Sequence, residues 1–405
     1  MTSGMDANVA HKSTLGKNEI RILILEPLDE DFDSAFIQCR LVSTFIEGSV
    51  EYEALSYTWG EDARSPTCCI DCNEAVVSVS RNLYEALLAL RLPDRSRTLW
   101  VDALCIDQAS NDERNHQVSL MARIYRKATR VIIWLGKEGP AKDAERSFQH
   151  LKRLHNLVNI ESKQVHRQSS LLSHVSESYL HATAPEQERT FLAKTALVLS
   201  SHPLVGLALN AFLSRPWFRR RWVLQEVYNS REAVLHCSDA QMPWEEFVVG
   251  ILRLFSADHR YRVPLPIFNV PHGHRNLILD HLDLFDEYEC HDDRDRIFSL
   301  LSLDERNSFL PDCNLTTPEL FIKFAQYSVT DGGGLQILAQ ASWQSLEARA
   351  QSGLQTPSWV PDWRQSVRDP RAVDNDALRF STRWKEELIL DETEYVKPSP
   401  VCVTC

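Results

Sequence analysis

The segment from residue 215 to residue 230 combines cations, large apolar side chains and a single acid in a pattern that could do chemistry. It reads RPWFRRRWVLQEVYNS, and its one carboxylate is Glu226. Ser214 can cap a helix and Pro216 fits a first turn, so we predict one helix over this segment. Residues four apart on a helix share a face, which would put the Glu226 carboxylate beside the Trp222 indole. Such a neighbour raises the pKa of a carboxyl group and excludes water, as in acid–base sites.

The same carboxylate also has a structural interpretation, as one half of an ion pair. The side chains three and four positions away on the helix are Trp222, Val223, Asn229 and Ser230, and none of them is cationic. A pair within the helix is therefore excluded, whereas a partner from elsewhere in the chain is not. Both interpretations stay open on sequence alone.

The three arginines from Arg219 to Arg221 raise the question of a basic surface. One helix would point them in three directions, so they cannot form a single basic face. The formal net charge of -12 also offers no excess of positive charge to displace counterions. We therefore expect no nucleic-acid binding; one arginine could meet a phosphate or Glu226, while the others are solvated or paired with acids.

A second group of candidate residues follows a predicted strand. The segment YEALSYTWG over 52–60 places Ser56, Trp59 and Gly60 at or after the carboxyl end of that strand. In doubly wound sheets, ligands bind beyond the carboxyl ends of the strands, and an indole there can stack on a flat ring. The alternative is structural: a tryptophan that caps the core, with a turn at the glycine.

Two acids follow the next predicted strand. Asp102 and Asp107 lie in RTLWVDALCID, over 97–107. Acids at this position can bind ribose hydroxyls, or they can cap the helix that follows. We favour the structural role for Asp107, and both roles stay open for Asp102.

Hydrophobic periodicity supplies the elements that must position these residues. Residues 52–136 alternate strand, helix, strand, helix and strand, ending in the apolar RVIIWLG. This alternation predicts an α/β fold with a doubly wound, mostly parallel sheet. Further strands are predicted at 19–28 and 37–46, and a hairpin with its turn near 71–74.

The remaining segments are mainly helical in pattern. Residues 195–214 lack Asp, Glu, Lys and Arg, but Ser200 to Pro203 interrupt them with polar groups and a helix breaker. We expect two short buried helices there and no membrane span. The amino-terminal residues lack the long apolar region of a secretory signal, which predicts a cytoplasmic protein.

The cysteines give no metal site by spacing. Cys68, Cys69 and Cys72 cluster in the predicted hairpin, and a zinc site would need a second pair of ligands at a suitable distance. Cys105 and Cys237 are single. We expect no metal, and reduced thiols.

Three blocks of this sequence resemble the fungal heterokaryon-incompatibility (HET) domain. They are YEALSYTWG, LWVDALCIDQASNDERNHQVSLMARIYRKATRVIIWLG and RPWFRRRWVLQEV, in order over roughly residues 52–230. The resemblance implies a role in non-self recognition, in which fusion of unlike hyphae triggers cell death. It suggests the following organisation: a disordered terminus at 1–18, a HET domain at 19–230 with core motifs at 52–136 and 215–230 and a helical insertion at 138–212, and a mainly helical region at 231–405.

HET domains are in turn similar to TIR domains, which have a flavodoxin-like sheet and in some cases cleave NAD with a glutamate in a W-x-x-x-E pattern. Trp222 and Glu226 match that spacing. This resemblance implies NAD as a substrate rather than a cofactor, Glu226 as the catalytic residue, and a pocket formed by Trp222, Trp59, Ser56, Gly60 and Asp102. A carboxylate can stabilise the oxocarbenium charge that develops when such a bond breaks. The alternative is a non-catalytic death-signalling module that acts by self-association or by binding an allelic partner.

Overall fold

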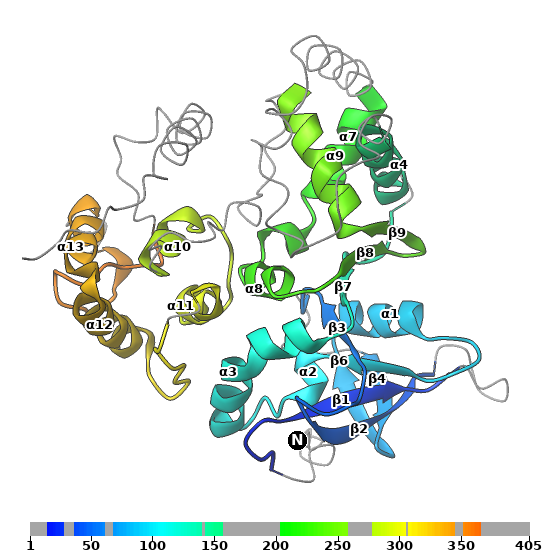
Figure 1. Cartoon of the computed structure of the whole chain (residues 1–405), viewed down its shortest axis with the longest axis horizontal. Coiled ribbons are helices and arrows are strands. Elements are labelled where there is room, and N and C mark those ends of the chain that lie inside the picture. Colours follow the sequence, from blue (N-terminus) through cyan, green and yellow to red (C-terminus); the bar gives the residue numbers. More distant parts are fainter. Residues whose placement is uncertain are drawn as a thin grey trace, which may run out of the picture.

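The computed structural model describes residues 14–27, 36–60, 68–139, 142–156, 203–257, 278–304, 307–344 and 351–365 (Figure 1). Most of the predicted disordered terminus, the middle of the predicted insertion and the last 40 residues lie outside these ranges. All statements below concern the described residues.

A nine-stranded mixed sheet forms the centre of the fold. Its order is β5-β4-β2-β1-β6-β3-β7-β8-β9. The strands are β1 Glu19–Leu25, β2 Gln38–Phe45, β3 Glu53–Ser56, β4 Cys68–Cys72, β5 Ala75–Val79, β6 Arg97–Trp100, β7 Val131–Trp134, β8 Ala233–Cys237 and β9 Ala240–Pro243. The α/β prediction is confirmed.

The middle four strands, β6-β3-β7-β8, pair in parallel. Numbered along the chain, these four strands have the order 2-1-3-4, which is the beginning of the flavodoxin-like order. Strands β7 and β8 are buried along their whole length, as expected for parallel strands covered on both faces. On either side the sheet continues with four antiparallel pairs, β1 with β2, β1 with β6, β4 with β5 and β8 with β9, and with one more parallel pair, β2 with β4.

Local sequence signals explain the helices next to the sheet. Helix α1, Arg81–Leu90, begins where the Ser80 hydroxyl accepts from the Leu83 amide. Short helix α2, Asp102–Cys105, follows β6, and α3, Asn111–Lys127, begins where the Ser110 hydroxyl accepts from the Glu113 amide. In each case a hydroxyl satisfies an amide that the first turn leaves without a partner.

The predicted single helix over 215–230 is wrong. A 3-10 helix covers Pro216–Arg219, the chain is extended at Arg220, and α8 begins at Val223 and ends at Tyr228. The backbone of this break pairs with a distant segment: the Arg221 amide donates to the Glu289 carbonyl at 2.8 Å, and the Glu289 amide donates to the Arg219 carbonyl at 2.7 Å. These hydrogen bonds replace those that a continuous helix would have made.

The remaining helices form two groups (Figure 1). Helix α4, Asp143–Asn156, packs on α7, Pro203–Leu213, and on α9, Trp244–Ala257. The carboxyl-terminal group has α10 Ile278–Leu284, α11 Asp295–Phe298, α12 Thr317–Ser328 and α13 Gly334–Trp343. Helix α7 supplies the second half of the apolar segment 195–214. No helix in the described ranges is long and apolar enough to cross a membrane.

Candidate functional site

Two neighbouring strand ends place the first residues of the site. Ser56 is the last residue of β3, and Asp102 lies two residues after the end of β6. Because β3 and β6 are parallel neighbours, their carboxyl ends meet at one edge of the sheet. Ser56 is fully buried, and Asp102 is 7% exposed.

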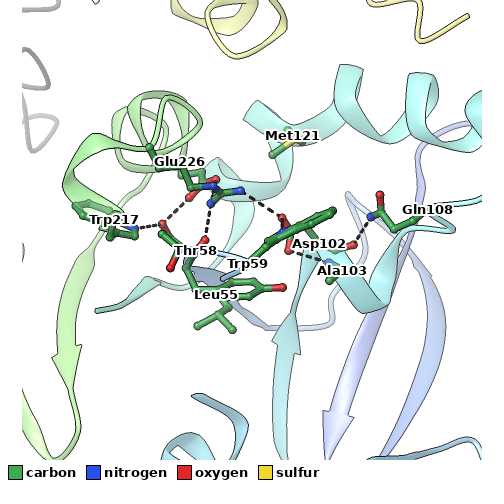
Figure 2. Close-up of polar contacts among 12 residues, drawn as sticks. Leu55, Thr58, Trp59, Asp102, Ala103, Gln108, Met121, Trp217 and Glu226 are labelled. Atoms are coloured by element: carbon green, nitrogen blue, oxygen red, sulfur yellow. Dashed lines mark hydrogen bonds and ion pairs between the residues drawn. The ribbon is translucent and has the colours of Figure 1, made fainter. Parts of the chain in front are cut away.

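Glu226 reaches this edge from α8. Its side chain is completely buried, and both carboxylate oxygens have partners. The Ser56 hydroxyl donates to Oε2 at 2.5 Å, and the Arg220 Nη1 donates to Oε1 at 3.1 Å. The Trp217 indole donates in turn to the Ser56 Oγ at 2.8 Å (Figure 2). The carboxylate is therefore held by a hydroxyl and a guanidinium, away from solvent.

Arg220 joins the two acids of the site. Its Nη1 also donates to the Tyr57 carbonyl at 2.7 Å, and its Nη2 lies 3.6 Å from the Asp102 Oδ2. That same Asp102 oxygen accepts from the Trp59 indole at 2.9 Å. Figure 2 shows the resulting chain of polar contacts from Trp217 through Glu226 and Asp102 to Trp59.

The electrostatics of the site shift the pKa of Glu226 upward. Burial raises the pKa of its carboxyl group above the ordinary value, and the charge of Asp102 adds to that increase. Arg220 and the Ser56 hydroxyl act in the opposite direction, because they stabilise the charged form. The net direction is upward, as is typical of carboxyl groups that take part in acid–base chemistry.

The structure brings together four of the six predicted site residues: Glu226, Ser56, Asp102 and Trp59. Trp222 meets Glu226 through its backbone, because its carbonyl accepts from the Glu226 amide at 3.3 Å. The Trp222 indole makes a hydrogen bond with Asp295, so the expected indole contact with Glu226 is replaced by the Ser56–Trp217 pair. Gly60 is exposed and has a φ of 86°, a conformation that glycine adopts without strain.

Three further residues of the network were not among the predicted site residues. Trp217 and Tyr57 lie in quoted segments but carry no spacing signal of their own. Arg220 was one of the three arginines, Arg219 to Arg221, that could have paired with Glu226. The break in the helix before α8 is what brings Arg220, rather than the other two, to the carboxylate. Asp107 has the structural role that we expected, because its carboxylate accepts from the Ala109 amide in a turn at 3.0 Å.

Comparison with known proteins identifies the part of the chain that contains these residues. Residues 52–226 match the family model described as heterokaryon incompatibility protein (HET). The chain carries a HET domain. The matched range of this HET domain includes Ser56, Asp102 and Arg220, and its last residue is Glu226.

A curated relative extends the similarity beyond the HET domain. The chain is 23% identical to heterokaryon incompatibility protein 6, OR allele, of Neurospora crassa, over 86% of this chain and 58% of the relative. This chain thus spans less than two thirds of the relative's length. No solved structure matches the chain.

Metal chemistry finds no support in the geometry of the described residues. Within those ranges, no three His, Cys, Asp or Glu side chains are grouped so that they could hold a metal ion. The polar groups of the site are instead two carboxyls, one guanidinium, one hydroxyl and two indoles.

Proposed function

We propose that this chain acts in heterokaryon incompatibility and that its HET domain kills the cell by hydrolysing the nicotinamide–ribose bond of NAD with Glu226. The observation that supports the proposal is the convergence of Ser56, Asp102, Trp59 and Glu226 at the carboxyl ends of parallel strands. These residues come from three separate segments of the chain. Ligands of open α/β sheets bind at this end of the strands.

Hydrolysis of the nicotinamide–ribose bond needs little more from the protein than one carboxylate. The bond between the ribose C1′ and the nicotinamide nitrogen breaks, and its electron pair neutralises the pyridinium. The Glu226 carboxylate stabilises the positive charge that develops on the ribose. A water molecule then adds to C1′ and releases a proton, giving ADP-ribose and nicotinamide.

Arg220 connects this reaction to substrate binding. Glu226 has no contact with solvent while Arg220 holds it. NAD carries a diphosphate, which a guanidinium binds well. In our proposal, Arg220 exchanges its two carboxylates for that diphosphate, and Glu226 becomes available to the ribose. Trp59, which is 38% exposed, offers a face on which a flat ring can stack.

A second candidate function is a non-catalytic death-signalling module. The complete burial of Glu226, with a partner for each oxygen, favours this alternative because a structural ion pair requires the same arrangement. In this case killing depends on self-association or on an allelic partner, and the carboxylate serves only to hold α8 against β3.

A killing assay with Glu226→Gln distinguishes the two functions. Glutamine keeps the shape of the side chain and one acceptor oxygen, but it replaces the other oxygen with an NH2 donor and loses the charge. We expect this variant to accumulate in fungal cells at the wild-type level and to lose killing, whereas Glu289→Gln, at a side chain that is 68% exposed, keeps it. A folded Glu226→Gln protein that kills as well as the wild type would reject the enzymatic proposal in favour of the signalling module.

A further inference from the structure

Two buried cysteines lie directly opposite each other at the edge of the sheet. Cys39 of β2 and Cys72 of β4 are paired residues in the parallel register of these strands. Neighbouring strands are about 4.8 Å apart, which lies within the range of about 4.4–6.8 Å that a disulfide needs between its Cα atoms. The Cys39 thiol donates to the Asp71 carbonyl at 3.4 Å, next to the Cys72 sulfur.

The interaction between the two neighbouring sulfurs affects their acidity in opposite directions. It raises the pKa of Cys39, and it lowers the pKa of Cys72 below the ordinary value of a thiol. The thiolate is the nucleophilic form of cysteine. Cys72 is therefore the sulfur better prepared to attack, and Cys39 supplies the second sulfur beside it.

A cavity gives small molecules a path to Cys39, one member of this pair. It has a volume of about 550 Å³, and Cys39, Asp71 and Asn73 are among the residues that line it. The polar groups of Arg40 and Glu74 also line it, so it suits a polar molecule. Hydrogen peroxide is far smaller than this volume.

The hairpin that carries Cys72 is held to β2 over a short distance. Two residue pairs connect β4 with β2 in the ladder, Gln38 with Asp71 and Cys39 with Cys72. The Asp71 amide donates to the Ile37 carbonyl at 2.9 Å, the Asn73 amide donates to the Cys39 carbonyl at 3.1 Å, and the Leu41 amide donates to the Asn73 side chain at 3.0 Å. Peroxide from the cavity would reach the Cys72 sulfur when this contact opens locally.

We propose that Cys39 and Cys72 form a reversible dithiol–disulfide pair that hydrogen peroxide oxidises. The Cys72 thiolate attacks one peroxide oxygen and the O–O bond breaks, which leaves a sulfenic acid on Cys72 and a hydroxide that takes up a proton. The Cys39 sulfur then attacks the Cys72 sulfur, and the departing hydroxide takes the Cys39 proton to form water. Two thiols are oxidised to one disulfide, and one peroxide is reduced to two waters.

The disulfide would constrain the part of the chain that carries the candidate site. The segment between Cys39 and Cys72 contains β3, Ser56 and Trp59. Closing this segment into a loop reduces the freedom of the unfolded chain, so oxidation stabilises the fold.

The test is to map the disulfides of the full-length protein before and after peroxide. Reduced protein is treated with hydrogen peroxide, its free thiols are blocked with iodoacetamide, and its peptides are analysed by mass spectrometry. We expect a Cys39–Cys72 cross-linked peptide that dithiothreitol removes, together with an increase in Tm on the order of 5 °C. An unchanged Tm would overturn the stabilising role.

Cys69 provides the matched control. It lies on the same hairpin but is exposed, so blocking by iodoacetamide is expected there in both samples. The Cys69→Ser variant should form the Cys39–Cys72 disulfide as the wild type does, and Cys39→Ser should trap a sulfenic acid on Cys72. Peroxide that leaves both buried thiols free, oxidises them to sulfinic acids, or links mainly Cys68 or Cys69 would overturn the proposal.

Discussion

Arg220 is the residue on which the polar site depends. Its guanidinium lies between the carboxylates of Glu226 and Asp102, and its side chain is 17% exposed. Two buried acids without a cation between them would repel each other and would lose the interaction that offsets their desolvation. The neighbouring Arg219, by contrast, is 55% exposed and lies 3.8 Å from Glu289.

Removing this guanidinium should destabilise the fold. We expect Arg220→Ala to lower the free energy of unfolding by about 3 kcal/mol, because it leaves two acids buried without their cation. Arg219→Ala is the matched control and should cost less than about 1 kcal/mol, as for other exposed ion pairs. Urea denaturation of both variants measures the difference, and equal stabilities would show that Arg220 is not the cation on which the site depends.

Three residues of the polar network could be predicted because a general rule places them, and a fourth could be predicted on a separate ground. Ser56, Trp59 and Asp102 follow parallel strands, and the carboxyl ends of such strands form the ligand-binding edge. Glu226 was marked by being the single acid of its segment. The partner of Glu226 could not be predicted from helix spacing, because Arg220 reaches it only where the helix is interrupted.

The interruption between the 3-10 helix and α8 is the element that positions Arg220. The extended chain at Arg220 forms an isolated parallel bridge with Glu289. Local sequence favours a helix here, with a proline in the first turn and no glycine. Backbone hydrogen bonds to a segment some 70 residues later in the chain override that preference, as tertiary contacts often override propensity.

Two substitutions at Glu289 distinguish the contribution of its backbone hydrogen bond from that of its side chain. Glu289→Pro removes the amide that donates to the Arg219 carbonyl, and we expect a loss of about 2 kcal/mol of unfolding free energy. Glu289→Ala keeps the amide and should cost less than about 1 kcal/mol, since the side chain is 68% exposed. Thermal denaturation would contradict this account if both variants had the same Tm.

Elements with local signals were predicted more accurately than this one. The hairpin turn near 71–74 is confirmed: Asn73 and Glu74 both have a positive φ between β4 and β5, the conformation of a tight two-residue turn. Helix α3 begins after Ser110, whose hydroxyl caps its first turn. These features depend on residues that are close in sequence, whereas the break at Arg220 depends on Glu289.

At the scale of the whole molecule, the carboxyl-terminal region contacts the segment from Arg221 to Glu226. The buried Arg221 donates to the carbonyls of Phe285 and Arg296, and Ser302 donates to the Gln225 side chain at 2.7 Å. Trp222, predicted to line the pocket, is bound to Asp295 of α11 instead. This region is therefore in a position to influence Glu226 through α8.

The burial of the Asp295 carboxyl group should give stability a pH dependence. Burial raises the pKa of Asp295 to about 6, with Asp292 adding to the increase and Trp222, Arg220 and Arg294 opposing it. An acid whose pKa is higher in the folded protein binds its proton more tightly there, so its contribution to stability is present below about pH 4 and is lost as the pH rises through 6.

Asp295→Asn isolates this contribution. Relative to the wild type, the variant should become more stable as the pH rises from 4 to 7, by at most about 3 kcal/mol for a shift of two pKa units. Urea denaturation at several pH values measures this difference between the two proteins, and taking the difference cancels the other titrating groups. A constant difference across the range would contradict the raised pKa of Asp295.

The proposed reaction can be tested directly on the purified protein. Full-length protein at high concentration, or concentrated further by a crowding agent, should convert NAD into nicotinamide and ADP-ribose in equal amounts, as measured by chromatography. Glu226→Gln should lower that rate by at least about 100-fold, the smaller end of the contribution of a positioned acid or base, while Glu289→Gln leaves it unchanged. NAD that stays intact with the wild-type protein, or nicotinamide release that survives in Glu226→Gln, would contradict a catalytic role for Glu226.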